Sequence, residues 1–263
     1  MLGLRVFVAL LLVVFAGCSD VTPDPTDPDD MVDPTDPPPP PPTPVGTTVF
    51  VHTATELYKM NDLDFDLQRL GEFGAEENIT DLAITPDGRI FGISGESLYE
   101  VNPNNALATF VAEVPGELNV GLTFLPNGQL LATDKLGGVR EIAPDTGVIT
   151  EIGEFGKGWG TAGDLVAVAD GTMYAIGEDQ DAGPTDSNLL LTVNTSTGEA
   201  ELVGELGYGE TYGTAYANGK VYAFTSVGDV IEVDPNTGAG TLVRSHPDVS
   251  FWGAAVSPLV SVE

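Results

Sequence analysis

Two aspartates, Asp81 and Asp164, occupy the same position in two similar segments of the sequence, DLAITPDG and DLVAVADG. Carboxylates at equivalent positions of a repeated unit can meet at the centre of a closed fold, where calcium prefers such oxygen ligands. A carboxylate pair can also serve as acid and base in a hydrolase. Alternatively, each aspartate caps neighbouring backbone N–H groups. The pair is therefore a candidate calcium site, catalytic pair or backbone cap.

Four aromatic side chains form a second candidate, a ligand-binding surface. They stand in KGWGTAG, YGETY and DVSFW and are Trp159, Tyr208, Tyr212 and Trp252. Aromatic faces stack on sugar rings and hold cations, so the expected ligand is a glycan, a peptide or a protein. In the alternative interpretation Tyr212 and Trp252 only fill gaps between packed units. Trp159, between two glycines, is expected to be the most exposed.

Other chemistry has little support in the sequence. His52 and His246 are the only histidines and are far apart in the repeat, which disfavours a histidine-ligated zinc or a quinone-type enzyme. No constellation of a serine or cysteine nucleophile is present.

A repeated pattern of strands surrounds these residues. Five segments read as a strand, a polar turn and a second strand; they are 57–73, 98–114, 139–155, 190–206 and 230–246. Another strand pair precedes each of the last four, with the turns PDG, PNG, ADG and ANG. Glycine at the end of such turns is typical of hairpins. Units of about 41 residues with four antiparallel strands predict the blades of a β-propeller.

The two ends of the repeated region complement each other. TVFVHTATELYKM at 48–60 reads as the second and third strands of a unit, and FWGAAVSP at 251–258 as a first strand. Their pairing would complete a fifth blade and remove exposed sheet edges. We therefore expect an all-β, five-bladed propeller over residues 47–263, closed by its C-terminal strand. The alternative is a solenoid of the same units, but a solenoid would not need complementary strands at its two ends.

This topology predicts which residues share a site. The equivalent positions nearest the axis are Asp81, Gly121, Asp164, Gly213 and Gly253. Loops between blades, and those between second and third strands, fall on one face, which collects the four aromatic residues. Binding residues concentrate on such loops.

Charge excludes several partners. Residues 47–263 hold eight Lys or Arg and 33 Asp or Glu, a formal charge of −25. Such a surface repels nucleic acids and anionic lipid head groups.

The first residues predict export. Arg5 precedes ten apolar residues, 6–15, which are too few to span a bilayer and are typical of a secretory signal. The sequence FAGC, ending at the only cysteine, resembles the processing site of bacterial lipoproteins. The resemblance implies a signal peptide at 1–17 and lipid, including palmitate, on Cys18, which would anchor the chain stably. Ser19, where an aspartate would favour the inner membrane, implies the outer membrane.

Residues 18–46 are expected to form a disordered linker. Within 19–46 there are eleven prolines, seven aspartates and no lysine or arginine, so little apolar surface is available for burial. Proline extends such a chain, which favours a stalk; a proline-rich ligand for a partner is the alternative.

Phrases such as DLAITPDG and VIEVDPNTG resemble those of exported bacterial propellers with gluconolactonase-like, NHL-like and quinoprotein-like blades. That group includes lactonases, dehydrogenases, lectins and scaffolds, so the resemblance implies blade geometry rather than an activity. We expect a membrane-anchored extracytoplasmic propeller that binds ligands without catalysis. The alternative is a carboxylate-dependent hydrolase or lactonase acting at the channel.

Overall fold

The computed structural model describes residues 46–115, 119–182 and 187–259. The chain divides into two units, Met1–Pro44 and Val45–Glu263, and all described residues belong to the second. The predicted signal peptide 1–17, Cys18 and almost the whole linker 18–46 lie outside the described residues. Within the described part of the chain, no helix is long and apolar enough to cross a bilayer.

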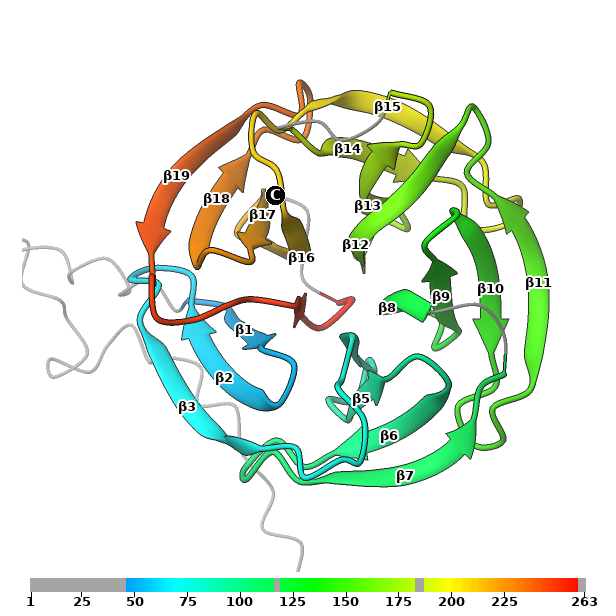
Figure 1. The fold of residues 1–263 in the computed structure, drawn as a ribbon, viewed down its shortest axis with the longest axis vertical. Coiled ribbons are helices and arrows are strands. Elements are labelled where there is room, and N and C mark those ends of the chain that lie inside the picture. The colour runs from blue at the N-terminus through cyan, green and yellow to red at the C-terminus, as the bar shows by residue number, and fades with distance from the viewer. Residues whose placement is uncertain (1–45, 116–118, 183–186, 260–263) are drawn as a thin grey trace, which may run out of the picture. The chain divides into compact units, whose positions relative to one another are not determined.

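The second unit is a five-bladed β-propeller, as predicted (Figure 1). Each blade is an antiparallel sheet of four strands. The blades, from the inner to the outer strand, are β20 (Gly253–Ala255), β1 (Thr48–His52), β2 (Glu56–Asn61), β3 (Leu67–Glu72); β4 (Asp81–Ile84), β5 (Ile90–Ile93), β6 (Ser97–Val101), β7 (Ala108–Glu113); β8 (Asn119–Phe124), β9 (Leu130–Asp134), β10 (Gly138–Ile142), β11 (Ile149–Glu154); β12 (Trp159–Ala167), β13 (Met173–Asp179), β14 (Leu189–Val193), β15 (Ala200–Glu205); and β16 (Thr211–Ala217), β17 (Lys220–Thr225), β18 (Asp229–Val233), β19 (Gly240–Ser245).

The ring closes by pairing its two ends, also as predicted. β20 lies antiparallel to β1, with Phe50 opposite Ala255 and His52 opposite Gly253. The last strand therefore becomes the innermost strand of the blade that begins the domain. All five blades therefore have four strands, and the strand β1 does not remain an exposed sheet edge.

Burial explains the different sequence patterns of the strands. The second strands β5 and β9 are buried along their whole length, because neighbouring blades cover both of their faces. The outer strands β7, β11, β15 and β19 lie at the periphery and expose part of their side chains. Large apolar side chains such as Phe91, Phe155 and Phe251 fill the space between sheets.

The turns between third and fourth strands also join blades. Gly238, with a positive φ of 76°, approaches the next blade so closely that a Cβ there would lie 2.7 Å from the backbone of Gly204. Glycine alone avoids that clash and accepts this backbone conformation. In the second blade Ala106 takes the equivalent left-handed conformation, with φ of 67°.

Candidate functional site

The five inner strands converge on the two aspartates predicted from the sequence. Asp81 and Asp164 are both fully buried. Oδ1 of Asp81 accepts a hydrogen bond from the N–H of Leu82 at 2.8 Å. Its Oδ2 accepts one from the N–H of Leu122, in the neighbouring blade, at 2.6 Å. Asp81 thus ties β4 to β8.

Asp164 joins the other three blades. Its Oδ1 accepts from the N–H of Leu165 at 2.5 Å. Its Oδ2 accepts from Thr214 in β16 at 2.7 Å and from Ala254 in β20 at 3.1 Å. Together the two carboxyl groups satisfy one backbone N–H from each of the five inner strands. Buried N–H groups without an acceptor would be costly, so this arrangement holds the centre of the propeller together.

The three other axial positions are glycines, and a Cβ at any of them would lie too close to a neighbouring atom. A Cβ at Gly253 would lie 2.3 Å from Nε2 of His52 and 2.4 Å from Oδ1 of Asp81. A Cβ at Gly213 would lie 2.9 Å from the carbonyl carbon of Gly253. The division into two aspartates and three glycines therefore has a steric cause.

Burial controls the protonation of this cluster. Loss of solvation raises the pKa of Asp81 well above its ordinary value and that of Asp164 to about 8. The negative charge of the nearby Asp164 adds to the rise in the pKa of Asp81, because two like charges in a buried site repel each other. Burial also lowers the pKa of His52 to about 4, so its imidazole is neutral at pH 7.

The neutral His52 contributes little to an ion pair. Its Nδ1 donates to the carbonyl oxygen of Thr53 at 2.8 Å, which leaves Nε2 as the unprotonated nitrogen. Nε2 lies 3.9 Å from Oδ1 of Asp81 and has no hydrogen-bond partner among the described residues.

These contacts agree with the backbone-capping alternative, although the caps reach across blades rather than to a neighbouring loop. All four carboxyl oxygens already accept hydrogen bonds from N–H groups. Among the described residues, no group of three or more His, Cys, Asp or Glu could hold a metal ion, so calcium stays a prediction from the sequence.

A pocket of about 300 Å³ opens above this buried pair; we call it the axial pocket. Five of its lining residues each directly precede an axial position; they are Thr80, Val120, Gly163, Tyr212 and Trp252. Lys135, Thr161 and Ala162 complete the lining. Because every blade contributes, the axial pocket exists only in the closed ring.

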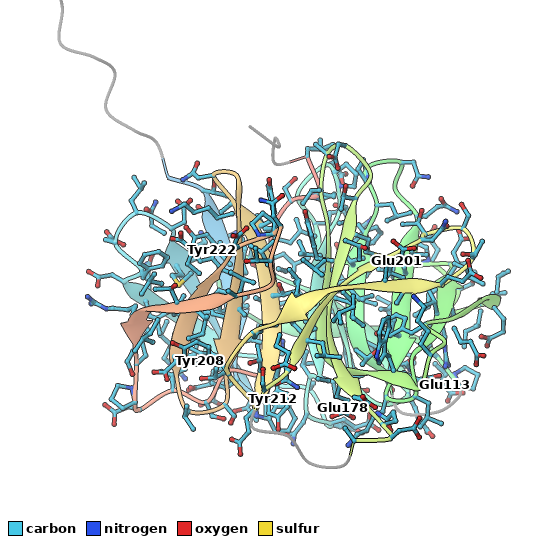
Figure 2. The ribbon with its side chains drawn as sticks, turned by 90° about the horizontal axis from the view of Figure 1, so that it is seen from above. Glu113, Glu178, Glu201, Tyr208, Tyr212 and Tyr222 are labelled. Carbon is cyan, nitrogen blue, oxygen red and sulfur yellow. The ribbon has the colours of Figure 1, made fainter. Side chains whose placement is uncertain are left out.

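The structure separates the four predicted aromatic residues into two pairs. Tyr212 and Trp252 line the axial pocket, whereas Trp159 and Tyr208 do not. Tyr208, Tyr212 and Glu178 lie towards the same face of the propeller, away from Tyr222 (Figure 2). Tyr212, with 36% of its surface exposed, is the most exposed of the four, so the expectation for Trp159 is wrong.

Trp159 and Tyr208 instead have packing contacts. Trp159 packs between blades against a buried apolar cluster, and the ammonium group of Lys157 lies 4.9 Å from its ring centroid. Tyr208 packs against another cluster, and its hydroxyl accepts a hydrogen bond from the N–H of Leu242 at 3.2 Å. Packing within the propeller therefore accounts for this pair.

Two polar lining residues were not predicted from the sequence. Lys135 follows β9 in a loop between second and third strands, and Thr161 lies near the start of β12. The predicted face includes such loops, so the position of Lys135 could have been inferred. Thr161 could not, because neither its residue type nor its neighbours distinguish it from other strand threonines.

Comparisons with known proteins support the fold. Neither a family model nor a curated protein matches the sequence. A chain from the crystal structure of a nidogen/laminin complex is 12% identical, with a TM-score of 0.56 over 81% of this chain and 100% of that chain. A chain from a study of the de novo evolutionary emergence of a symmetrical protein is 16% identical, with a TM-score of 0.51 over 82% and 100%. At these identities the likeness shows a β-propeller and no more.

Replacement of Asp164 by alanine is expected to destabilise the propeller by about 2–5 kcal/mol, because the N–H groups of Thr214 and Ala254 lose their acceptor in a buried site. Urea unfolding measures this loss. Asp234→Ala is the control, since Asp234 accepts a backbone hydrogen bond from the N–H of Asn236 in an exposed turn. Equal losses in the two variants would contradict the bridging role of Asp164.

Stability is expected to fall as the pH rises from about 6.5 to about 8. The raised pKa of Asp164 means that the folded state binds the proton more tightly, so the free energy of unfolding decreases towards the folded pKa. Below about 6.5 the lowered pKa of His52 acts in the opposite direction, which is why the interval starts there.

Urea unfolding of the wild-type chain and of Asp164→Asn at several pH values in this interval checks the effect. The variant cannot titrate at residue 164, so its stability should vary less with pH than that of the wild type. Parallel curves would show that the buried pair is not the cause.

Proposed function

We propose that this chain is an exported lipoprotein whose propeller binds a ligand in the axial pocket without catalysing a reaction. Cys18 would carry the lipid at the outer membrane, and residues 18–46 would hold the propeller away from the bilayer. The ligand is a glycan, a peptide or a protein, and nucleic acids are disfavoured by the charge of −25 over residues 47–263.

The axial pocket is the observation that carries the binding part of this proposal. Tyr212 and Trp252 offer aromatic surface beside a concave site, and Lys135, Thr80 and Thr161 offer polar groups. A few polar groups among aromatic and apolar walls are typical of small-ligand sites. The volume suits one sugar ring or one side chain.

The buried aspartates favour binding over hydrolysis. A general acid or a nucleophile must reach its substrate, and neither Asp81 nor Asp164 has any exposed surface or lines the axial pocket. Their raised pKa values follow from burial and from their role between blades. The hydrolase or lactonase alternative would need both carboxyl groups to be uncovered.

Anchoring is supported by the sequence alone, through the short apolar run before Cys18 and the proline-rich stretch after it. We expect the full chain, expressed in a bacterial host, to incorporate labelled palmitate and to sediment with outer-membrane fractions. Cys18→Ala should abolish both, whereas Ser19→Ala should leave labelling unchanged. Incorporation of palmitate by the Cys18→Ala variant would exclude this anchor.

Ligand binding is expected to depend on the aromatic walls of the axial pocket. On an array of glycans and peptides, Trp252→Ala and Tyr212→Ala should each lose at least about fivefold in affinity for whatever the wild-type chain retains, since aromatic contacts contribute on the order of 1 kcal/mol or more. Tyr208→Phe is the matched control, because Tyr208 is an aromatic residue outside the pocket. Binding that survives both pocket substitutions would refute the site.

A further inference from the structure

Lys135 differs from the other basic residues of the propeller. Among the described residues, it is the only Lys or Arg without an acidic, carbonyl or aromatic partner for its charged group. The partners of the others are Glu56 and Glu72 for Arg69, Glu100 for Arg89, Asp134 for Arg140, Glu232 for Lys220, Asp66 for Arg244, the carbonyl oxygen of Ala200 for Lys157 and the ring of Phe50 for Lys59.

This exception is unexpected in so acidic a domain. With 33 acidic and eight basic residues in 47–263, an unpaired ammonium group has abundant carboxylates available. Lys135 nevertheless lines the axial pocket, and none of the described lining residues is acidic. Lys135 is the only charged residue among the described lining residues, so the pocket suits a ligand that brings an anionic group.

Thr161 provides a second, independent indication of a ligand. Its side chain is 1% exposed, and its hydroxyl has no hydrogen-bond partner among the described residues. Buried hydroxyls are almost always paired, and an unpaired one needs an explanation. Thr161 lines the same pocket as Lys135, so a ligand hydroxyl there would supply the missing partner.

The buried residues next to the pocket do not oppose an anion. Three titratable groups, Asp81, Asp164 and His52, are fully buried, and each aspartate directly follows a lining residue. Burial raises the pKa of both carboxyls and lowers that of the imidazole, so the cluster has little charge at pH 7. Five N–H groups also point at this centre, with their positive ends towards it.

The surroundings of Tyr212 limit how much negative charge the ligand can have. Glu178 and Glu210 act on Tyr212 through their charge and, together with burial, raise its pKa. They would repel a ligand with many anionic groups along its length. A single carboxylate that enters the pocket and reaches Lys135 avoids most of this repulsion.

We propose that the axial pocket binds a single acidic sugar residue, a pyranose ring with one carboxylate. The carboxylate pairs with Lys135, a ring hydroxyl bonds to Thr161, and the apolar face of the sugar stacks on Trp252 or Tyr212. This inference rests on the proposed binding function and names the class of its ligand.

Isothermal titration of the full chain in detergent with methyl glucuronide and methyl glucoside tests this proposal, because the two sugars differ only at the carboxylate. We expect the wild type to prefer the glucuronide by about tenfold or more. Lys135→Gln should lose that preference and keep the weaker binding of the glucoside. Lys220→Gln is the matched control, since Lys220 pairs with Glu232 outside the pocket.

Two further probes separate this ligand from related ones. Hippurate has a carboxylate and an aromatic ring but no sugar hydroxyls, and we expect it to bind more weakly than the glucuronide and to be indifferent to Thr161→Val. Polygalacturonate should also bind more weakly per residue, because Glu178 and Glu210 repel it. Hippurate binding as tight as that of the glucuronide would overturn the assignment to a sugar.

The outcomes also distinguish this inference from the proposed function. Equal affinity for glucuronide and glucoside, both reduced in Trp252→Ala, would overturn the acidic-sugar assignment and leave a binding propeller. A preference that persists in Lys135→Gln would overturn the role of Lys135. If no sugar binds while another array ligand depends on Trp252, the sugar class is wrong and the pocket stands. If nothing on the array depends on Trp252, both proposals fall.

Discussion

The structure depends on the hydrogen bonds between two buried carboxyl groups and five backbone N–H groups at the centre of the propeller. Each inner strand directs one N–H towards the axis, where no water-accessible surface remains around Asp81 and Asp164. Neighbouring blades also meet through apolar side chains, whose burial does not specify direction, and through hydrogen bonds away from the axis, such as the one that the N–H of Ala167 donates to the Thr123 hydroxyl. These directional bonds therefore set how the inner strands approach one another, while the apolar clusters between the sheets supply most of the favourable burial.

Symmetry is broken at the axis for a physical reason. Five aspartates would place five desolvated carboxyl groups in contact, which is unfavourable even when protons are shared. Five glycines would leave the inward N–H groups without acceptors. Two aspartates and three glycines satisfy the donors and fit the space, as the short distances around a Cβ at Gly253 show. With this arrangement the buried residues next to the axial pocket have little charge. The pocket forms only when the ring is closed, because all five blades line it.

The axial pocket differs in charge from the rest of the domain surface. Five of the eight basic side chains of the propeller pair with acidic side chains, so the surface presents mainly carboxylates. Lys135, at the pocket wall, is therefore the feature that distinguishes this site electrostatically from the rest of the described surface. Tyr212 and Trp252 both stand directly before axial glycines and line the same pocket.

The sequence predicts the strands and the blade count, because alternating apolar residues and glycine turns are local features repeated about every 41 residues. Its complementary ends predict the closure of the ring, and the repeat places Asp81, Asp164, Tyr212 and Trp252 near the axis. What these residues contact depends on the tertiary structure. Whether an aspartate faces a ligand or the N–H of another blade, and whether Trp159 is exposed or packed, depends on strands distant in sequence. Lys135 and Thr161 acquire their significance in the same way, since the missing partner of a side chain can be recognised only when all its neighbours in space are known.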